Sequence, residues 1–465
     1  MRETAFFVTA VAFAVFFGAP TPAVAQTPTA VQSPAAAQSD SASRTPAKAE
    51  PFAFADFTWL NGNARQSRSV LDSKYVTGEF RLDATYIYDA NHPRDHTLVG
   101  SSESGRTGEV QVQQLGIGGD VHVGHVRGRV MTQFGMYAQM TPRSDASSAR
   151  GQWGLDNAYR YLSEAYGGYH FDAMHGVNVD AGLFMSYVGL FSYYNFDNWA
   201  YQPSYVSSNT PWFFNGVRIQ TFPTDKLKLE YWIVNGWQSY GMFNEAPGLG
   251  VQLLYRPTGA LSFVSNDYWG YDTPGNAARQ RWHTDNSLQV KYLDHPASAI
   301  SKGALSLTID AGCEQGGGVS CAGGADGPAQ NFVGAMLYNR TWFARDRYAL
   351  TLGGGFMNNP GRYLVLLPPI SGATAASGTP YFTTNPGDAY SAWDATVTFD
   401  LMPDEWSTLR VELAHRAASV PYFAGEGGVT PPNGNTGPAG ATVPGWAPDL
   451  RTSETRVMVA FLIKL

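Results

Sequence analysis

The sequence predicts an all-β fold: a transmembrane antiparallel up-and-down β-barrel of about 16 strands with short periplasmic turns and long extracellular loops. Three observations predict it, namely an N-terminal export signal, apolar residues that alternate with polar ones, and connections that alternate between short and long. The composition agrees, because the 465 residues include 50 Gly, 26 Phe, 25 Tyr and 12 Trp but only 15% charged residues. Such a composition favours strands joined by turns.

Residues 1–25 contain the three parts of a secretory signal peptide in order. Arg2 supplies the positive charge, residues 5–17 are apolar, and the Ala-Val-Ala sequence at 23–25 forms a cleavage site. The apolar stretch is shorter than the ~20 residues of a membrane-spanning helix, and Pro20 follows it. We therefore expect a cleaved signal peptide and export, with an N-terminal membrane anchor as the alternative.

Three further segments follow the signal peptide. Residues 26–50 are mostly Ala, Pro, Ser, Gln and Thr and lack aromatic residues, which predicts a flexible periplasmic linker. An alternative role for the linker is to bind the cell wall or a periplasmic partner. Residues 51–76 regain aromatic residues without alternation, so we expect them near the barrel mouth, where they either plug the lumen or leave it open. The barrel is expected to occupy residues 77–465.

Clean alternation marks the predicted strands. From Glu79 to Tyr88 and from Trp393 to Asp400, apolar residues at every second position alternate with charged or hydroxyl residues, as a strand between lipid and water requires. Further strands are predicted at 109–121, 126–138, 162–171, 177–186, 212–222, 227–233, 249–256, 261–271, 288–292, 305–310, 331–342, 348–357, 409–413 and 452–465.

The connections alternate in length, as they should if every second one lies in the periplasm. Short turns are predicted at 223–226, 257–260, 344–347 and 402–405. Long loops rich in Gly, Pro and Asn are predicted at 89–108, 141–161, 188–211, 236–248, 312–330, 358–389 and 417–451. A soluble β-sandwich has no reason to alternate its connections in this way.

The last predicted strand places Val457, Val459, Phe461 and Ile463 on one face, and the sequence stops at Leu465. Terminal strands of this kind are read by the barrel-assembly machinery, although Leu465 replaces the usual final aromatic residue. The expected location is the bacterial outer membrane, in contact with lipid and lipopolysaccharide.

Several other classes of protein are disfavoured. A net charge of −7 and a pI near 5.7 argue against a nucleic-acid partner. The sequence contains no Gly-x-Ser-x-Gly elbow, no His-Glu-x-x-His zinc helix and no phosphate loop, so we expect no enzyme and no cofactor. A membrane lipase that uses His170 or His415 is the least favoured alternative. Cys313 and Cys321 predict a loop disulfide in an exported protein, and two thiols are too few for a closed metal site.

A barrel of about 16 strands is wide enough to leave an aqueous channel. Charged side chains on the inward faces support it, because Arg or Lys facing lipid would cost about 2–4 kcal/mol at the membrane midplane. Each of these charges either meets solute or pairs with a neighbour in the wall. The predicted pore-lining residues are Arg127, Arg129, Arg218, Lys228, Glu230, Arg256, Lys291, Asp310, Arg340, Asp394, Asp400, Arg410 and Glu412.

The loop at 189–210 follows the fifth predicted strand and is long and aromatic. We expect it either to fold into the lumen as a constriction or to stay outside and pack on neighbouring loops. Inside the lumen, its rings would offer a stacking surface for sugars or aromatic solutes. The predicted constriction residues are Tyr193, Tyr194, Asp197, Trp199, Tyr201 and Tyr205.

Residues 177–276 resemble the OmpL-like family of outer-membrane β-barrel porins. The resemblance rests on Ala-Gly-Leu-Phe at 181–184, Asn-Gly-Val-Arg at 215–218, Val-Asn-Gly-Trp at 234–237 and Tyr-Trp-Gly at 268–270. Members of that family often carry Gly-x-Glu after the fifth strand, whereas this chain has Val188-Gly-Leu-Phe191 there.

The resemblance implies a wide single-chain barrel with passive transport. The function expected is therefore an outer-membrane porin that lets small hydrophilic solutes diffuse through a water-filled lumen. The alternative is a structural or adhesive outer-membrane barrel whose lumen is plugged and whose external loops carry the function. Association with further copies of the chain is compatible with either.

Overall fold

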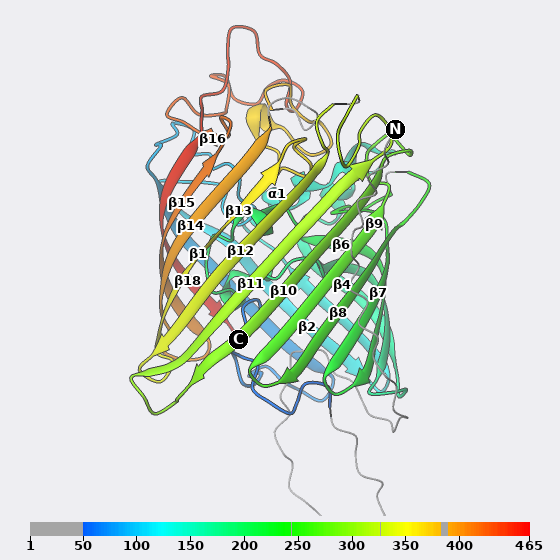
Figure 1. Ribbon diagram of the computed structural model, residues 1–465, viewed down its shortest axis with the longest axis vertical. Helices are drawn as coiled ribbons and strands as arrows, with labels where there is room; N and C mark the ends of the chain where they lie inside the picture. Colours follow the sequence, from blue (N-terminus) through cyan, green and yellow to red (C-terminus); the bar gives the residue numbers. More distant parts are fainter. Residues whose placement is uncertain (1–49, 243, 326, 383–388) are drawn as a thin grey trace, which may run out of the picture.

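The structure is a computed structural model that describes residues 50–242, 244–325, 327–382 and 389–465. The predicted signal peptide and residues 26–49 of the predicted linker lie outside the described residues. Sixteen antiparallel strands close into one barrel, which confirms the predicted fold class (Figure 1). The barrel strands are β1 Val76–Asp89, β2 Val110–Val123, β3 Val126–Thr132, β4 Leu162–Phe171, β5 Val177–Met185, β6 Phe213–Thr224, β7 Leu227–Val234, β8 Gly248–Thr258, β9 Leu261–Gly270, β10 Gln280–Asp294, β11 Ile300–Gln315, β12 Asn331–Phe343, β13 Tyr348–Asn359, β14 Tyr390–Leu401, β15 Ser407–Ala418 and β18 Ser453–Lys464.

Each strand pairs with its neighbours in sequence, and β1 pairs with β18 to close the sheet. Leu82 faces Ile463 and Tyr86 faces Val459 across that closing pair. Burial alternates along the strands, most regularly in β14, where from Tyr390 to Asp400 the odd-numbered residues are exposed and the even-numbered ones are buried. The alternation read from the sequence is therefore the alternation between the outer surface and the lumen.

One strand is shorter than predicted. The alternation from Val126 to Ala138 suggested a single strand, but β3 ends at Thr132, and the chain then forms a helical turn, α1 (Tyr137–Met140). Tyr137 is buried against the rings of Tyr193 and Trp212, so tertiary packing overrides the local pattern. The other short helices are α2 Leu155–Ala158, α3 Tyr205–Ser208 and the 3-10 turns Pro142–Ser144, Ala146–Ala149, Asn195–Asp197 and Ile370–Gly372.

The two ends of the barrel differ. One end, here the turn end, carries connections of two to five residues, at 124–125, 172–176, 225–226, 259–260, 295–299, 344–347 and 402–406. The other, the loop end, carries the long loops L1 (90–109), L2 (133–161), L3 (186–212), L4 (235–247), L5 (271–279), L6 (316–330), L7 (360–389) and L8 (419–452). In bacterial barrels the short turns face the periplasm.

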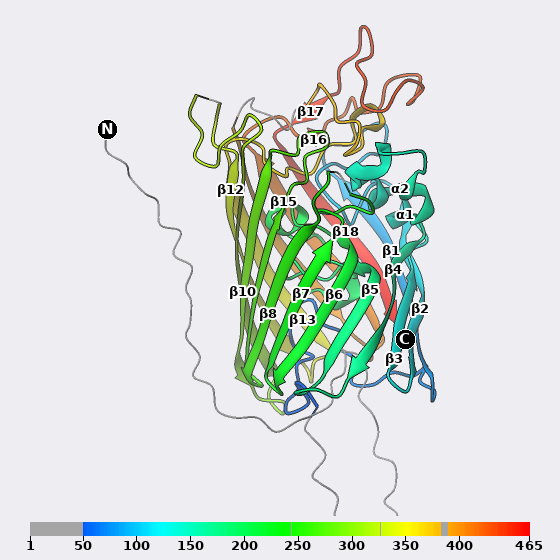
Figure 2. The same cartoon turned by 90° about the vertical axis from the view of Figure 1, so that its right-hand side faces the viewer.

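Loops cover the loop end of the barrel (Figure 2). L8 contains a small hairpin, β16 (Phe423–Ala424) and β17 (Leu450–Arg451). An apolar cluster joins L8 to L7 and L3 through Tyr422, Phe382 and Tyr205. The Asp95 carboxylate of L1 accepts hydrogen bonds from two backbone amides of L8.

Residues 51–70, here called the strap, lie across the turn end, where Figures 1 and 2 show them in dark blue. The amide of Phe52 donates to the carbonyl of Asp225, and the Trp59 indole donates to the carbonyl of Gly259 at 3.0 Å. On the other side of the mouth, Arg65 donates to the carbonyl of Asp404 at 2.7 Å. The strap therefore joins turns that lie on different sides of the barrel.

Exposed aromatic side chains form two rows around the outer surface. Trp282, Phe356 and Trp393 lie toward the loop end of their strands, and Phe263, Tyr292, Phe399 and Phe461 lie toward the turn end. Such rows mark the two interfaces of a membrane. In the described part of the chain, no helix is long and apolar enough to cross a bilayer.

Candidate functional site: the lumen and the loop inside it

L3 leaves β5, folds into the lumen and returns to β6. Every residue from Tyr193 to Phe214 is buried, and these residues contact the inner faces of strands on many sides of the barrel. Figure 2 shows the helical turns of L3 inside the wall. The inward-folding alternative for this loop is thus the one present in the structure.

Two arginines and one aspartate hold the first half of L3. Asp400 of β14 accepts from Arg340 of β12 at 2.7 Å and from Arg410 of β15 at 2.7 Å. Arg340 also donates to the carbonyl of Trp199, and Arg410 donates to the carbonyls of Asn195 and Asn198 at 3.2 and 2.6 Å. Arginine therefore links the wall carboxylate to the L3 backbone.

Two more carboxylates hold the second half of L3 through its backbone amides. Glu412 accepts from the amides of Tyr201 and Gln202, the latter at 2.8 Å. Asp394 accepts from the Ser204 hydroxyl at 2.7 Å and from the Tyr205 amide at 3.0 Å. These bonds to charged acceptors are the strong kind, and they fix the path of the loop.

A second charged network lies on β1 to β4 and on β18. Arg81 donates to Asp197 of L3 at 2.9 Å and stacks over the Tyr194 ring at 4.0 Å. Arg129 contacts three carboxylates, those of Glu79, Asp120 and Glu164, each at 2.9 Å. Lys464 adds a cation 3.6 Å from Asp197.

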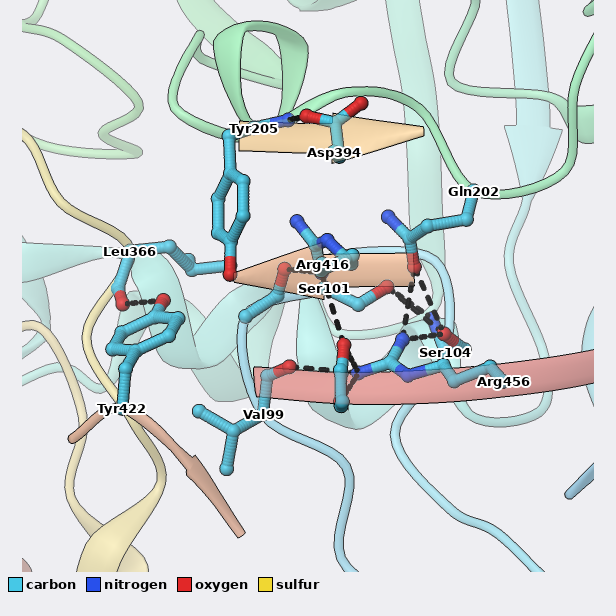
Figure 3. Close-up of polar contacts among 12 residues, drawn as sticks. Val99, Ser101, Ser104, Gln202, Tyr205, Leu366, Asp394, Arg416, Tyr422 and Arg456 are labelled. Carbon is cyan, nitrogen blue, oxygen red and sulfur yellow. Dashed lines mark hydrogen bonds and ion pairs between the residues drawn. The ribbon is translucent and has the colours of Figure 1, made fainter. Parts of the chain in front are cut away.

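Nearer the loop end, Arg416 and Arg456 connect the wall to L1 and L3 (Figure 3). Arg456 donates to the carbonyl of Val99 at 2.8 Å and to Gln202 at 3.0 Å. Arg416 lies over the Tyr205 ring at 4.0 Å and donates to the carbonyl of Gly100. Both arginines are buried, and Glu454 lies between them.

The opposite wall, formed by β3, β5–β7, β10 and β11, carries separate ion pairs beside a cluster of aromatic rings. Asp180 pairs with Arg218 at 2.7 Å and lies 3.5 Å from Arg127, and Glu230 pairs with Lys228 at 2.6 Å. The Arg218 guanidinium stacks on an aromatic cluster that includes Phe184 and Trp232. Asp310 lies 2.7 Å from His283.

The strap meets the lumen directly. The Trp199 amide donates to the side chain of Asn61, and the Gly62 amide donates to the carbonyl of Asp197 at 3.1 Å. Arg256 and Lys291 lie over strap rings, at 4.7 Å from the Phe57 ring and 5.8 Å from the Trp59 ring. A cavity of about 30 Å³ between strap, L3 and wall has room for about two water molecules.

Burial changes the titration of charged groups at both ends of the barrel. Burial, together with repulsion from Arg340 and Arg410, lowers the pKa of Arg65 in the strap to about 10. Burial raises the pKa of the Glu103 carboxyl in L1, against the opposing effect of a hydrogen bond from Ser102.

The thirteen residues predicted to line the lumen all project inward and are buried or half-buried. Sequence reasoning did not include Arg81, Glu164, Arg416, Glu454 and Arg456 among them. The signal was present, because Arg416 continues the even-numbered inward positions of Arg410 and Glu412. The six predicted constriction residues are buried inside the barrel as parts of L3.

A family model described as "Putative beta-barrel porin-2, OmpL-like" matches residues 76–444, which is nearly the whole barrel. This chain belongs to that family. It is therefore a porin of the outer membrane, and membership points to a channel instead of an enzyme. A comparison with curated protein sequences finds no match for this porin.

Solved porin structures resemble this porin at low sequence identity. The outer membrane channel DcaP of Acinetobacter baumannii is 14% identical, with 83% of this chain and 96% of that chain covered and a TM-score of 0.43. OprB of Pseudomonas putida is 11% identical, with 84% and 94% covered and a TM-score of 0.47. An anion-selective porin from Comamonas acidovorans is 11% identical, with 84% and 99% covered and a TM-score of 0.45.

The two cysteines and the two strand histidines singled out in the sequence each contact other side chains of the protein. Cys313 near the end of β11 and Cys321 in L6 form a disulfide. His170 contacts Asn178 at 2.8 Å, while His415 lies on the outer surface against Thr455 and the Trp393 ring. Within the described ranges, no group of three or more His, Cys, Asp or Glu residues is arranged to hold a metal ion.

Proposed function

We propose that the porin lets small hydrophilic solutes diffuse passively through its lumen, and that L3 and the strap determine the width of the path. The observation that carries this proposal is the charged inner wall, whose groups meet L3 through its backbone. Arg340, Asp400 and Arg410 are on the wall itself, so they would remain in a widened lumen and face water there.

At the turn end, the cavity between the strap, L3 and the wall has room for about two water molecules, so we expect the strap or L3 to move when a larger solute passes there. L3 is held by apolar packing of residues such as Phe196 and Trp199, and by hydrogen bonds between its backbone and charged groups such as Glu412 and Asp394. Water and polar solutes offer the same kinds of partner, so these bonds exchange more readily than a packed apolar contact. In this proposal, ions and small polar solutes replace the L3 contacts as they pass.

Planar-bilayer recording tests the proposal. We expect small stepwise conductance from the mature porin and a larger conductance after deletion of residues 51–70, because the strap covers the turn end. Deletion of residues 432–437, a shorter exposed segment at the tip of L8, serves as the control, since it removes surface chain without uncovering the turn end. Absence of conductance from all three proteins would overturn the proposal.

The packing of L3 and the strap against the inner wall also favours a second function, that of a structural or adhesive barrel whose L7 and L8 loops bind a surface partner. This function predicts that the barrel stays closed to ions even without the strap. It also predicts that grafting L7 and L8 onto another barrel transfers surface binding. Conductance of the strap deletion separates the two functions.

The finer features of location and partnership belong to the same proposal. A cleaved signal peptide at residues 1–25 would deliver the chain to the periplasm, and β18 would be read there by the barrel-assembly machinery. Lipopolysaccharide would surround the loop end of the inserted barrel.

A further inference from the structure

The outer surface between the two aromatic rows is apolar on nearly every strand. Val397 of β14, Val411 of β15 and Leu307 of β11 are typical exposed residues there. One group departs from this, and we call it the polar patch: Ser265 and Asp267 of β9 with Thr284 and Asn286 of β10. Between the rows, Asp267 is the one charged residue at an outward position in the described part of the barrel.

The backbone places the four side chains of the polar patch on the outer surface. Asp267 is exposed, whereas Asn266 and Tyr268 on either side of it are buried in the lumen. In the pairing of β9 with β10, Asp267 lies opposite Thr284, and Ser265 lies opposite Asn286. The patch therefore consists of two neighbouring cross-strand pairs, each with one residue from β9 and one from β10.

The patch lies within the membrane band. On β10, Trp282 and Tyr292 belong to the two aromatic rows and are ten positions apart. At ~3.3 Å per residue and a strand tilt of ~40°, ten positions rise ~25 Å, which is the height of the apolar band of such barrels. Thr284 then lies ~5 Å inside the band and Asn286 ~10 Å inside it, close to the midplane.

The hydrogen bonds within the patch leave groups without partners. Ser265 donates to the Asn286 side-chain oxygen at 2.7 Å, and the Asn286 amide donates to the Thr284 hydroxyl at 2.9 Å. None of the described side chains donates to the Asp267 carboxylate. One N–H of Asn286 and the O–H of Thr284 are likewise left to donate. Lipid chains offer no hydrogen bond to any of these groups.

The unpaired groups of the patch complement one another. Asp267 only accepts hydrogen bonds, and its neighbours Thr284 and Asn286 have donors to give. A two-fold axis through the patch would bring the Asp267 carboxylate of each copy to the Thr284 and Asn286 donors of the other copy. A self-complementary surface of this kind is what a two-fold dimer interface requires. Exposed Leu249 and Val251 of β8 and Ile309 of β11 supply apolar surface on both sides.

We propose that two copies of this porin associate in the membrane through the outer faces of β8–β11, with the polar patch at the centre. In the dimer, Asp267 of each copy accepts hydrogen bonds from Asn286 and Thr284 of the other. The apolar residues of β8 and β11 surround these bonds and exclude lipid.

Cysteine cross-linking in native outer membranes tests the contact. The natural cysteines are joined to each other, so one added cysteine gives a defined site. We expect Ser265→Cys to yield an oxidative cross-link at twice the mass of the chain. Val397→Cys, exposed on β14, is the matched control and should stay monomeric. Equal cross-linking of the two variants would overturn the proposal.

Loss of association tests the hydrogen bonds. In lipid nanodiscs, Asp267→Leu with Asn286→Leu should raise the dissociation constant of the dimer on the order of tenfold or more, because two symmetry-related sets of polar contacts are lost. Val411→Leu is the control. Three results would overturn the proposal: a monomeric native porin, a dimer that survives the double substitution, or a different protein or a lipid alone on the patch.

The outcome is independent of the proposed transport. Single-channel conductance of the monomer does not depend on the outer face of β9 and β10, so the double variant should keep it. Loss of conductance with an intact dimer would count against the transport proposal alone.

Discussion

Asp400 has the most consequential position of any single residue in the wall. Its carboxylate is fully buried and serves two arginines at once, and those arginines hold the L3 backbone. Removal of one member of a buried charged group leaves the other charges without compensation. Asp400 therefore stabilises both the barrel and the path of the loop.

Asp400→Leu should lower the free energy of unfolding by about 3–5 kcal/mol, because Arg340 and Arg410 lose their shared carboxylate. The measurement is urea unfolding of the porin refolded into lipid vesicles. Asp172→Asn, whose side chain is 61% exposed, is the matched control and should change stability by less than ~0.5 kcal/mol. A wild-type unfolding curve for Asp400→Leu would contradict the role of this residue.

Glu103 gives L1 a pH dependence of known sign. Burial raises the pKa of its carboxyl, so the folded porin binds this proton more strongly than the unfolded chain does. The stabilisation is fully present below the unfolded pKa of ~4.3 and is lost as the pH rises through the higher folded value.

Glu103→Gln removes this titration. As the pH is raised from 4 to 7, we expect the melting temperature of the wild type to fall relative to that of Glu103→Gln. The comparison cancels the other titrating groups, such as Asp145 in L2, which both proteins keep. A difference that stays constant across this range would rule out the effect.

At the scale of elements, the strap and L3 act as two layers in one lumen. Their backbones touch at Gly62, which has a positive φ of 77°. A Cβ atom at this position would lie 2.3 Å from the carbonyl oxygen of Leu190 in L3. Only glycine permits the close approach of the two segments.

Gly62→Ala should therefore push the strap away from L3 without deleting any polar group from either segment. We expect faster proteolytic cleavage within residues 51–70 when the protease is added from the turn end of oriented vesicles. Gly437→Ala in L8 is the control, because a Cβ atom at that position would have no other atom within 4 Å. Equal cleavage rates for the two variants would show that the contact at Gly62 does not hold the strap.

The sequence predicted the positions of the strands more fully than the contacts between their side chains. All sixteen strands were located, since the two-residue period of a strand between lipid and water is visible in segments such as Trp393–Asp400. The end of β3 was misplaced, because Tyr137 continues the apolar pattern while its ring packs against L3. Periodicity gives the face of a residue and carries no information about a partner such as Asp197, which lies 116 positions from Arg81.

At the scale of the whole molecule, closure of the barrel by β1 and β18 determines what the lumen contains. The inward charges of distant strands meet only in the closed barrel, as Arg81 of β1 and Lys464 of β18 do around Asp197. Such contacts depend on strand count, tilt and the path of L3 together. The candidate site could therefore be predicted as a set of inward residues but not as a network.

The strap also has a consequence for the order of folding. Gln66 donates to the backbone carbonyl of Lys464, the penultimate residue of the chain, and Arg65 donates to the turn between β14 and β15. The carbonyl of Lys464 takes up its position only when the last strand has joined the first. We therefore expect the earliest described segment to leave the ribosome to dock completely only after closure, so that protection of residues 65–66 from protease reports that the barrel has finished assembling.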